Sequence, residues 1–209
     1  MSYPAFFDNV PALTLVDPLG DFLGAFHHGH VEITYYDCVK LAGHSCPTVA
    51  SAYLMAAFGL DALYPEDSLP HRSQIKVELK APKTEGVTGV IGNVIAYIVG
   101  ANDESGFKGI GGVFSRNDLL SFGQDTLEGM VRLTRTDTSS SVTLSSDTSQ
   151  VPGSPEMMPL MQKAMQGAAS PEEKAQFQAL WQGRVEAMLC NPDLQKKIIT
   201  IHSQGETLS

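Results

Sequence analysis

The chain has 209 residues, 43% of them hydrophobic, which suffices for one core or for a main domain with a helical appendage. Its formal net charge of -9 creates a negative field that repels nucleic-acid backbones and anionic lipids, so neither is expected as a partner. Residues 1–10 carry no basic segment leading into an apolar run, which favours a cytoplasmic protein. The longest apolar stretch, Val49 to Phe58, is shorter than the roughly 20 residues that cross a bilayer.

The first half of the chain predicts a short helix, a strand and a long buried helix. Asp17 and Pro18 are typical of a helix start, and we expect this helix to end at His27. Alternation of apolar and polar residues over 31–36 predicts a strand with one face buried. The segment after Pro47 is apolar on every side, which indicates a helix enclosed by the core that ends near Gly59 or one turn later.

The middle of the chain predicts a sheet and a glycine-rich loop. Ile75–Leu79 alternates and indicates a strand with a charged outer face. The β-branched run Val87–Val99 predicts one long bent strand or two strands. Gly100–Gly112 holds five glycines and indicates a flexible loop whose backbone amides could approach a ligand. Met130–Thr136 and Val142–Ser146 predict a hairpin.

The C-terminal third is expected to be helical. Ser170 and Pro171 begin a capping box, and an amphipathic helix follows until Asn191. This helix either covers its own domain or forms a dimer contact. The prediction is thus an α+β fold, with a mixed or antiparallel sheet around a buried central helix. Residues 1–149 would form the core domain and residues 150–209 a helical extension.

The segment Gly43-His44-Ser45-Cys46-Pro47 is the strongest candidate for a chemical site. Pro47 suits the first position of a helix, which makes Cys46 the capping residue and turns its sulfur toward the free amide hydrogens of the first turn. The positive end of the helix stabilises a thiolate, so Cys46 could act as a nucleophile or a soft metal ligand. His44 lies two residues earlier, and we expect both side chains to converge on one space.

Further candidate ligands lie nearby in the sequence. His27, His28 and His30 form a cluster that could supply nitrogen ligands to zinc, although a solvated loop is an equal alternative. Asp37 and Cys38 could orient His44 or add a ligand, while an ordinary buried thiol is the simpler interpretation of Cys38. The three cysteines, an odd and scattered set, do not suit a disulfide framework, and Cys190 is interpreted as structural.

The run Asp37 to Leu54, with Gly-His-Ser-Cys-Pro at its centre, resembles the FmdE family, which is named after a component of formylmethanofuran dehydrogenase. Gln74–Leu79 after Pro70-His71-Arg72, and Gly106-Phe107-Lys108-Gly109, are also similar to that family, so the resemblance spans about Pro18 to Phe122. It implies an α+β fold, a homodimer, and a cavity in which His44 and Cys46 hold a transition metal such as zinc.

The chain also departs from the pattern of that family. Many members have a histidine where this chain has Ala42 and a glycine where it has Thr48, so either one ligand is missing or His28 or His30 supplies it instead. Several members end in a four-cysteine zinc finger, whereas only Cys190 follows Phe122 here. No nucleic-acid role is therefore inferred from the resemblance.

Three functional hypotheses follow. In the first, His44 and Cys46 bind a zinc-like ion with one open position, as catalytic zinc sites do. Lys108 and Arg116 then clamp an anionic substrate group, with solvated surface charge as the simpler interpretation of each. In the second, Cys46 is a metal-free redox or nucleophilic thiol with His44 as its base. In the third, the chain is a non-catalytic accessory protein that delivers a metal to a larger oxidoreductase.

Overall fold

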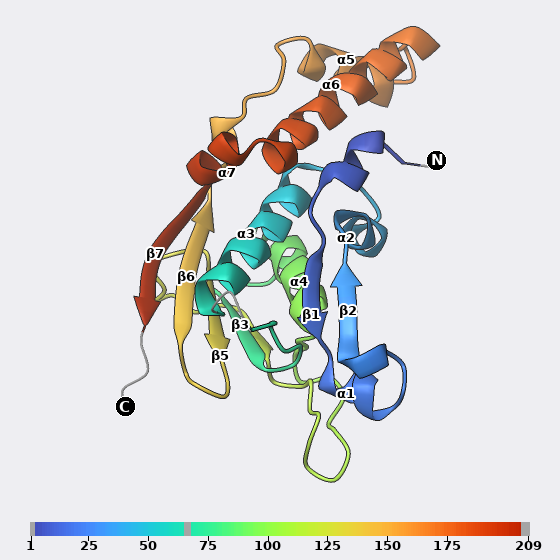
Figure 1. Cartoon of the computed structure of the whole chain (residues 1–209). Coiled ribbons are helices and arrows are strands. Elements are labelled where there is room, and N and C mark those ends of the chain that lie inside the picture. The colour runs from blue at the N-terminus through green and yellow to red at the C-terminus, as the bar shows by residue number, and fades with distance from the viewer. Residues whose placement is uncertain (1–2, 65–67, 206–209) are drawn as a thin grey trace.

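The structure, a computed structural model that describes residues 3–64 and 68–205, is an α+β fold built around one central helix. Helix α3 (Pro47–Leu63) packs against a five-stranded sheet and against helices α2, α4 and α6. A separate two-stranded sheet lies on the other side of α3 (Figure 1). The predicted fold class, a sheet packed on a buried central helix with helices toward the C-terminus, is confirmed.

The remaining elements follow in chain order. They are η1 (Ala5–Asn9), β1 (Leu13–Val16), α1 (Pro18–Phe22), η2 (His27–Gly29), β2 (His30–Ile33), α2 (Tyr35–Ala42), β3 (Ile75–Leu79), α4 (Thr88–Val99), β4 (Leu120–Ser121), β5 (Val131–Arg135), β6 (Ser141–Ser146), η3 (Thr148–Gln150), α5 (Met157–Met165), α6 (Pro171–Cys190), α7 (Pro192–Ile198) and β7 (Ile199–Gly205).

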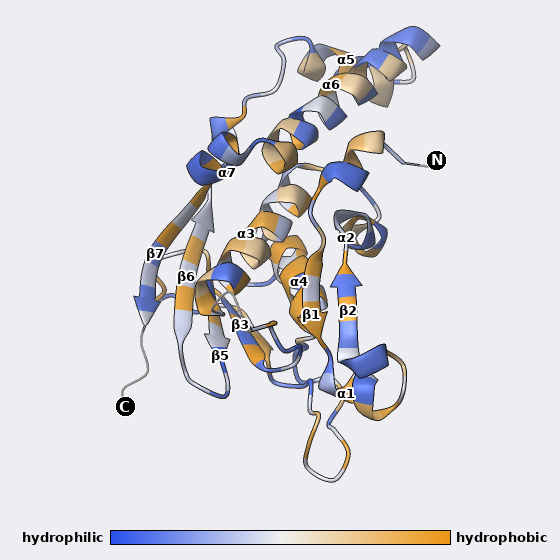
Figure 2. Cartoon of the chain, viewed as in Figure 1, coloured by the Kyte–Doolittle hydropathy of each residue, from blue (hydrophilic) through white to orange (hydrophobic). Residues whose placement is uncertain are grey.

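Helix α3 has the all-round burial that its composition predicts. Eleven of its residues are buried, and its ribbon is largely hydrophobic (Figure 2). Small residues allow the sheet to approach closely, since a Cβ placed on Gly59 would lie 2.5 Å from Cδ1 of Leu133 on β5. The helix ends at Leu63, one turn beyond Gly59, as the second of the two predicted endpoints required.

The main sheet has the strand order β4-β3-β5-β6-β7. The predicted hairpin is confirmed as β5 and β6, while β3 pairs antiparallel with β5 and parallel with β4. The outer face of β3 is less open than predicted, because Glu78 lies opposite Arg132 in the register and is buried in an ion pair with it. Strand β7 was not expected, and it pairs with β6 as far as Gly205.

The prediction of strands over Val87–Val99 is wrong, because this segment forms helix α4. Its buried residues recur at helical spacing, with Ile91, Val94, Ile95 and Ile98 facing the core. Burial against α3 outweighs the β preference of the branched side chains. Gly92 permits the contact with Phe122, because a Cβ there would lie 2.7 Å from its ring.

Two predicted boundaries in the first half are also wrong. Strand β2 ends at Ile33, and Tyr35 opens helix α2 instead of extending the strand. Thr34 and Asp37 form a capping box that starts this helix, which is why the alternating pattern stops there. Helix α1 is capped by Asp17 as predicted, but it ends at Phe22 and not at His27.

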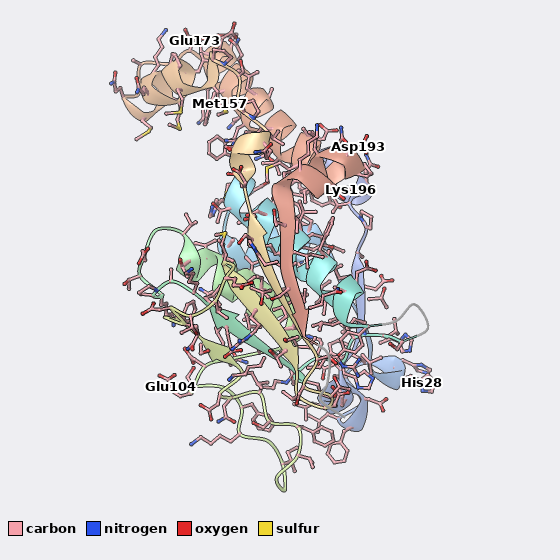
Figure 3. All side chains as sticks on the ribbon, turned by 90° about the vertical axis from the view of Figure 1, so that its left-hand side faces the viewer. His28, Glu104, Met157, Glu173, Asp193 and Lys196 are labelled. Atoms are coloured by element: carbon pink, nitrogen blue, oxygen red, sulfur yellow. The ribbon has the colours of Figure 1, made fainter. Side chains whose placement is uncertain are left out.

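The predicted C-terminal helix begins with the Ser170 capping box and runs through Cys190 as α6. Its last turns bury Val185, Met188 and Leu189 against the core, so this part of α6 covers its own domain. The other end of α6 pairs with α5, and the two helices project from the body (Figures 1 and 3). Among the residues described, no helix combines the length and apolar character that crossing a bilayer requires.

Candidate functional site

Cys46 caps helix α3, as its position before Pro47 predicts. The Sγ atom accepts a hydrogen bond from the backbone N–H of Val49 at 3.5 Å. Cys46 is only 8% exposed and belongs to the hydrophobic core. The preceding turn depends on Gly43, whose φ of 76° ends α2 in the left-handed region that favours glycine. The sulfur therefore faces helix amides, as expected, and solvent hardly reaches it.

His44 is exposed on the other side of this turn. Its Nδ1 lies 3.0 Å from the carbonyl oxygen of Ala42, so the tautomer with a proton on Nδ1 leaves Nε2 free. The ring borders a surface hollow of about 750 Å³ whose walls include Tyr3, Phe177 and Trp181. Cys46 is not among the described residues that line this hollow. The imidazole and the sulfur thus have different surroundings.

Ser45, between these two residues, connects the turn to helix α6. Its Oγ lies 3.0 Å from the hydroxyl of buried Tyr35 and donates to Oε1 of Gln182 at 2.9 Å. Its carbonyl oxygen accepts from Nε1 of Trp181 at 2.9 Å. Helix α6 therefore covers the start of α3, a contact between residues 136 or more positions apart that no local sequence signal reveals.

The early histidines lie in another part of the molecule. His27 and His28 belong to η2 and His30 opens β2, beside α1 (Figure 1; His28 is labelled in Figure 3). The rings of His27 and His28 contact each other edge to face, with their centroids 4.2 Å apart. Strand β2 and helix α2 separate this segment from His44. Within residues 3–64 and 68–205, no three His, Cys, Asp or Glu side chains are grouped to hold a metal ion.

Cys38 and Asp37 have structural partners. Cys38 is fully buried, and burial together with the nearby charge of Asp37 raises the pKa of its thiol to about 12. Asp37 accepts from the backbone N–H and hydroxyl of Thr34 and pairs with Lys40 at 2.6 Å. These contacts use the carboxylate to start α2, and no hydrogen bond to His44 is formed among them.

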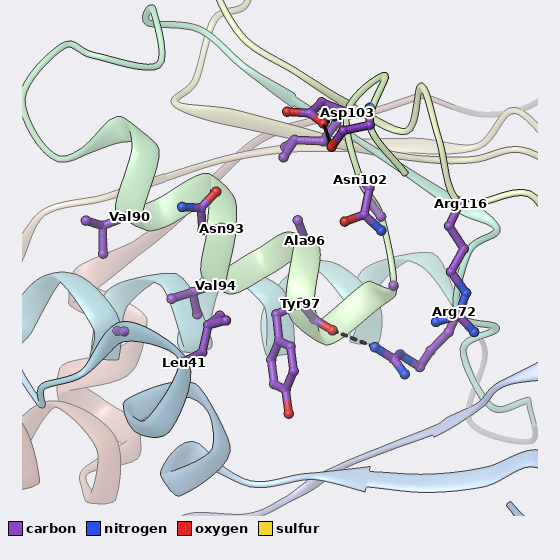
Figure 4. A pocket seen from close by; sticks show the side chains of 15 residues that line it. Leu41, Arg72, Val90, Asn93, Val94, Ala96, Tyr97, Asn102, Asp103 and Arg116 are labelled. Atoms are coloured by element: carbon purple, nitrogen blue, oxygen red, sulfur yellow. Dashed lines mark hydrogen bonds between the residues drawn. The ribbon is translucent and has the colours of Figure 1, made fainter. Parts of the chain in front are cut away.

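A cavity of about 500 Å³ lies between α2, α4 and the loop after α4, and we call it the α2–α4 cavity (Figure 4). One wall is apolar, from Leu41 on α2 and Val90 and Val94 on α4. The side-chain amides of Asn93 and Asn102 also line it, and neither has a hydrogen-bond partner among the described residues. Arg72 and Arg116 lie together at one end of the cavity (Figure 4).

The two arginines share one buried carboxylate, Asp17, and we call these three residues the arginine cluster. Nη1 of Arg72 lies 3.0 Å from Oδ2 of Asp17, and Nη2 of Arg116 lies 2.6 Å from Oδ1 and 2.7 Å from Oδ2. Asp17 is 1% exposed and also accepts from the backbone N–H of Gly20 at 2.8 Å. The carboxylate thus receives hydrogen bonds from three directions.

Backbone pairing places these residues together. The N–H of Val16 donates to Pro70 and the N–H of Arg72 donates to Val16, so the end of β1 runs beside the segment that carries Arg72. The guanidinium of Arg72 also donates to the carbonyl oxygens of Tyr97 and Ile98 in the last turn of α4. A cation at a helix C-terminus is favoured because these carbonyls lack helical partners.

The charges in the arginine cluster stabilise each other. Burial acts to raise the pKa of Asp17, but the hydrogen bond from Gly20 and the charges of Arg116 and Arg72 outweigh it and hold the pKa below its usual value. Burial lowers the pKa of Arg72, and Asp17 opposes that change. Asp17 is accordingly ionised at neutral pH, and the cluster carries two positive charges and one negative charge.

Of the two basic residues expected to clamp an anion, Arg116 lines the α2–α4 cavity and Lys108 does not. Lys108 is exposed within the glycine-rich loop, eight positions before Arg116 in the chain. Sequence reasoning missed Arg72 as a site residue and assigned Asp17 only a capping role. The one available signal was an arginine three positions before the first residue of a buried strand, which by itself is not specific.

The sequence was compared with protein-family models and with curated proteins. The chain matches no protein-family model, and no curated protein matches it.

Proposed function

We propose that the protein binds a small organic molecule in the α2–α4 cavity. The carrying observation is a cavity whose lining combines the apolar side chains of Val90 and Val94 with the side-chain amides of Asn93 and Asn102. The volume of the α2–α4 cavity, about 500 Å³, lies in the range of about 300–1,000 Å³ that is usual for small-molecule sites. Few polar groups on an apolar surface fix the orientation of a ligand, while the apolar surface supplies most of the binding free energy.

A variant that fills the cavity tests this proposal. Asn93 is exposed on α4, so Asn93→Trp puts an indole into the cavity without disturbing the core. Asn9→Trp, at an exposed asparagine outside the cavity, is the matched control. We expect compounds from a library of small organic molecules to raise the melting temperature of the wild type and of Asn9→Trp, but not of Asn93→Trp. Binding that survives Asn93→Trp, or a library without any binder, contradicts the proposal.

We keep a centre at His44 and Cys46 as a second candidate function. Two contacts support it: the Nδ1 of His44 faces the carbonyl of Ala42, which leaves Nε2 free for a metal such as zinc, and the Sγ of Cys46 lies at the N-terminus of α3. Catalysis at the metal, metal delivery to a larger oxidoreductase and metal-free thiol chemistry with His44 as base remain alternatives within this proposal. In the first of them His28 or His30 would complete the ligand set, which requires a rearrangement of β2.

Metal analysis separates these alternatives. The chain is purified without an affinity tag, and its metal content and thiol reactivity are measured for the wild type, Cys46→Ser and His44→Ala. Stoichiometric metal that is lost in both variants supports a metal centre, and turnover distinguishes an enzyme from a metal-delivery protein. A metal-free protein with one fast-reacting thiol, absent in Cys46→Ser, supports thiol chemistry. A metal-free protein without such a thiol contradicts the whole candidate.

The homodimer implied by the FmdE resemblance is likewise a proposal, as is a cytoplasmic location. Met158 and Met165 on α5 are 49% and 80% exposed, an apolar surface that a second copy could cover. Sedimentation velocity should then give twice the 22.5 kDa mass of one chain. The mass of a single chain at all concentrations contradicts a dimer.

A further inference from the structure

The arginine cluster leaves one positive charge uncompensated at the end of the α2–α4 cavity. Asp17 is the only carboxylate bonded to Arg72 and Arg116 among the described residues, and its two oxygens already accept from both arginines and from Gly20. Asp103, a carboxylate that lines the cavity itself, lies 3.4 Å from Lys83 and accepts from the N–H and hydroxyl of Ser105. That end of the cavity is neutral, so the excess charge stays with the arginines.

Arg116 is the arginine with donors to spare. Arg72 uses Nε, Nη1 and Nη2 to hold Asp17 and the end of α4, which makes it part of the framework. Arg116 makes its hydrogen bonds to Asp17 through Nη2 alone, and its Nε is buried with no partner among the described residues. A buried donor without an acceptor is unfavourable, so an acceptor on a ligand that reaches Arg116 is favoured.

We propose that the arginine cluster is a subsite for one negatively charged group, and that the ligand of the α2–α4 cavity is a small organic monocarboxylate. This inference rests on the proposed binding function of the cavity. The carboxylate accepts from Arg116, and the apolar body of the ligand lies against Val90 and Val94. A single net positive charge matches one carboxylate, whereas the overall charge of -9 disfavours anions that carry several charges.

Matched probe compounds test the charge requirement. Benzoate, phenylacetate and hexanoate are each compared with the corresponding primary amide and phosphonate by isothermal titration calorimetry. We expect the wild type to bind the carboxylate roughly tenfold more tightly than the amide, the size of one charge-assisted hydrogen bond, and more tightly than the phosphonate. Arg116→Gln should bring the carboxylate and amide affinities within roughly threefold of each other.

Two further variants keep the test specific. Lys108→Gln removes a positive charge from the same loop but outside the cavity, and should keep the tenfold preference. Arg116→Lys keeps the charge at the subsite and should retain part of the preference, which a purely structural role of Arg116 would not predict. Circular dichroism and thermal melting establish that each variant is folded before its affinities are compared.

The outcomes separate this inference from the proposed function. Equal affinity of the wild type for carboxylates and amides overturns the anion subsite and leaves a neutral-ligand cavity intact. Tighter binding of the phosphonates overturns the assignment to monocarboxylates. If library compounds bind and Asn93→Trp abolishes their binding while no carboxylate binds, the subsite is also overturned. Absence of any binder contradicts the cavity proposal itself.

Discussion

Asp17 combines two structural tasks that are usually divided between residues. Its carboxylate caps α1 through the N–H of Gly20 and also holds two guanidinium groups at the end of the cavity. The side chain is 1% exposed, so water cannot replace any of these partners. Removing the charge would leave the buried cation of Arg72 and the half-buried cation of Arg116 to repel each other, which costs far more than losing a surface ion pair.

We expect Asp17→Asn to lower the free energy of unfolding by about 3–5 kcal/mol, the range for breaking a buried ion pair. Asp103→Asn is the control, because Asp103 pairs with Lys83 at the surface and its loss should cost less than about 1 kcal/mol. Urea denaturation of both variants measures the difference. Equal costs would contradict the buried role of Asp17.

The pH dependence of stability should report the same carboxylate. Because the folded pKa of Asp17 lies below its usual 3.8, the unfolded chain binds the proton more readily than the folded chain. The stabilisation is complete above about pH 5 and is lost as the pH falls through about 4 toward the folded pKa. The difference in unfolding free energy between wild type and Asp17→Asn should therefore narrow on acidification. A difference that stays constant from about pH 6 to pH 3 contradicts this assignment.

At the scale of elements, the sequence predicted helices best where a capping signal marks their start. Ser170 with Pro171, and Cys46 with Pro47, placed α6 and α3 correctly. Helix α4 has no side-chain cap, and its β-branched residues imitate a strand, so only the spacing of its buried residues identifies it. The capping box at Thr34 is present in the sequence, but the alternating pattern before it obscures this signal.

Two glycine substitutions distinguish the crowded face of α4 from an open helix surface. Gly92→Ala should destabilise the protein by about 1–3 kcal/mol, because the new methyl group meets the ring of Phe122 and Cδ2 of Leu79. Gly183→Ala in α6 meets nothing within 4 Å and should stabilise by up to about 1 kcal/mol through helix propensity. Thermal and urea denaturation check both signs. Stabilisation by Gly92→Ala would contradict the packing of α4 on the sheet.

At the scale of the whole molecule, the sequence predicted the local geometry at Cys46 but not the cavity. Arg72 lies 55 positions and Arg116 lies 99 positions after Asp17 along the chain, and only the folded backbone brings the three residues together. Arg116 was selected from its place beside the glycine-rich loop, without any indication of its partner. Periodicity reports the burial of each element, whereas a cavity depends on how several elements are arranged.

Local stability should vary across the molecule in a way that hydrogen exchange can measure. Helix α5 buries only Met157 and extends from the body with part of α6, whereas α3 is enclosed by the core. We expect amides of α5 to exchange with a much smaller opening free energy than those of α3, with the buried last turns of α6 as the internal reference. Protection of α5 equal to that of α3 would contradict this prediction for the single chain and would instead fit the proposed homodimer, in which a second copy covers α5.

Strand β7 is synthesised last but pairs with β6, so the main sheet is complete only after the ribosome has made the C-terminal end of the described chain. A ribosome makes β6 well before β7, because α5, α6 and α7 come between them, so the nascent sheet presents an unpaired edge at β6 while these helices are made. During that interval the emerging chain can pair wrongly with other strands. Expression at a reduced translation rate should therefore lengthen the exposure of this edge and increase the demand for chaperones.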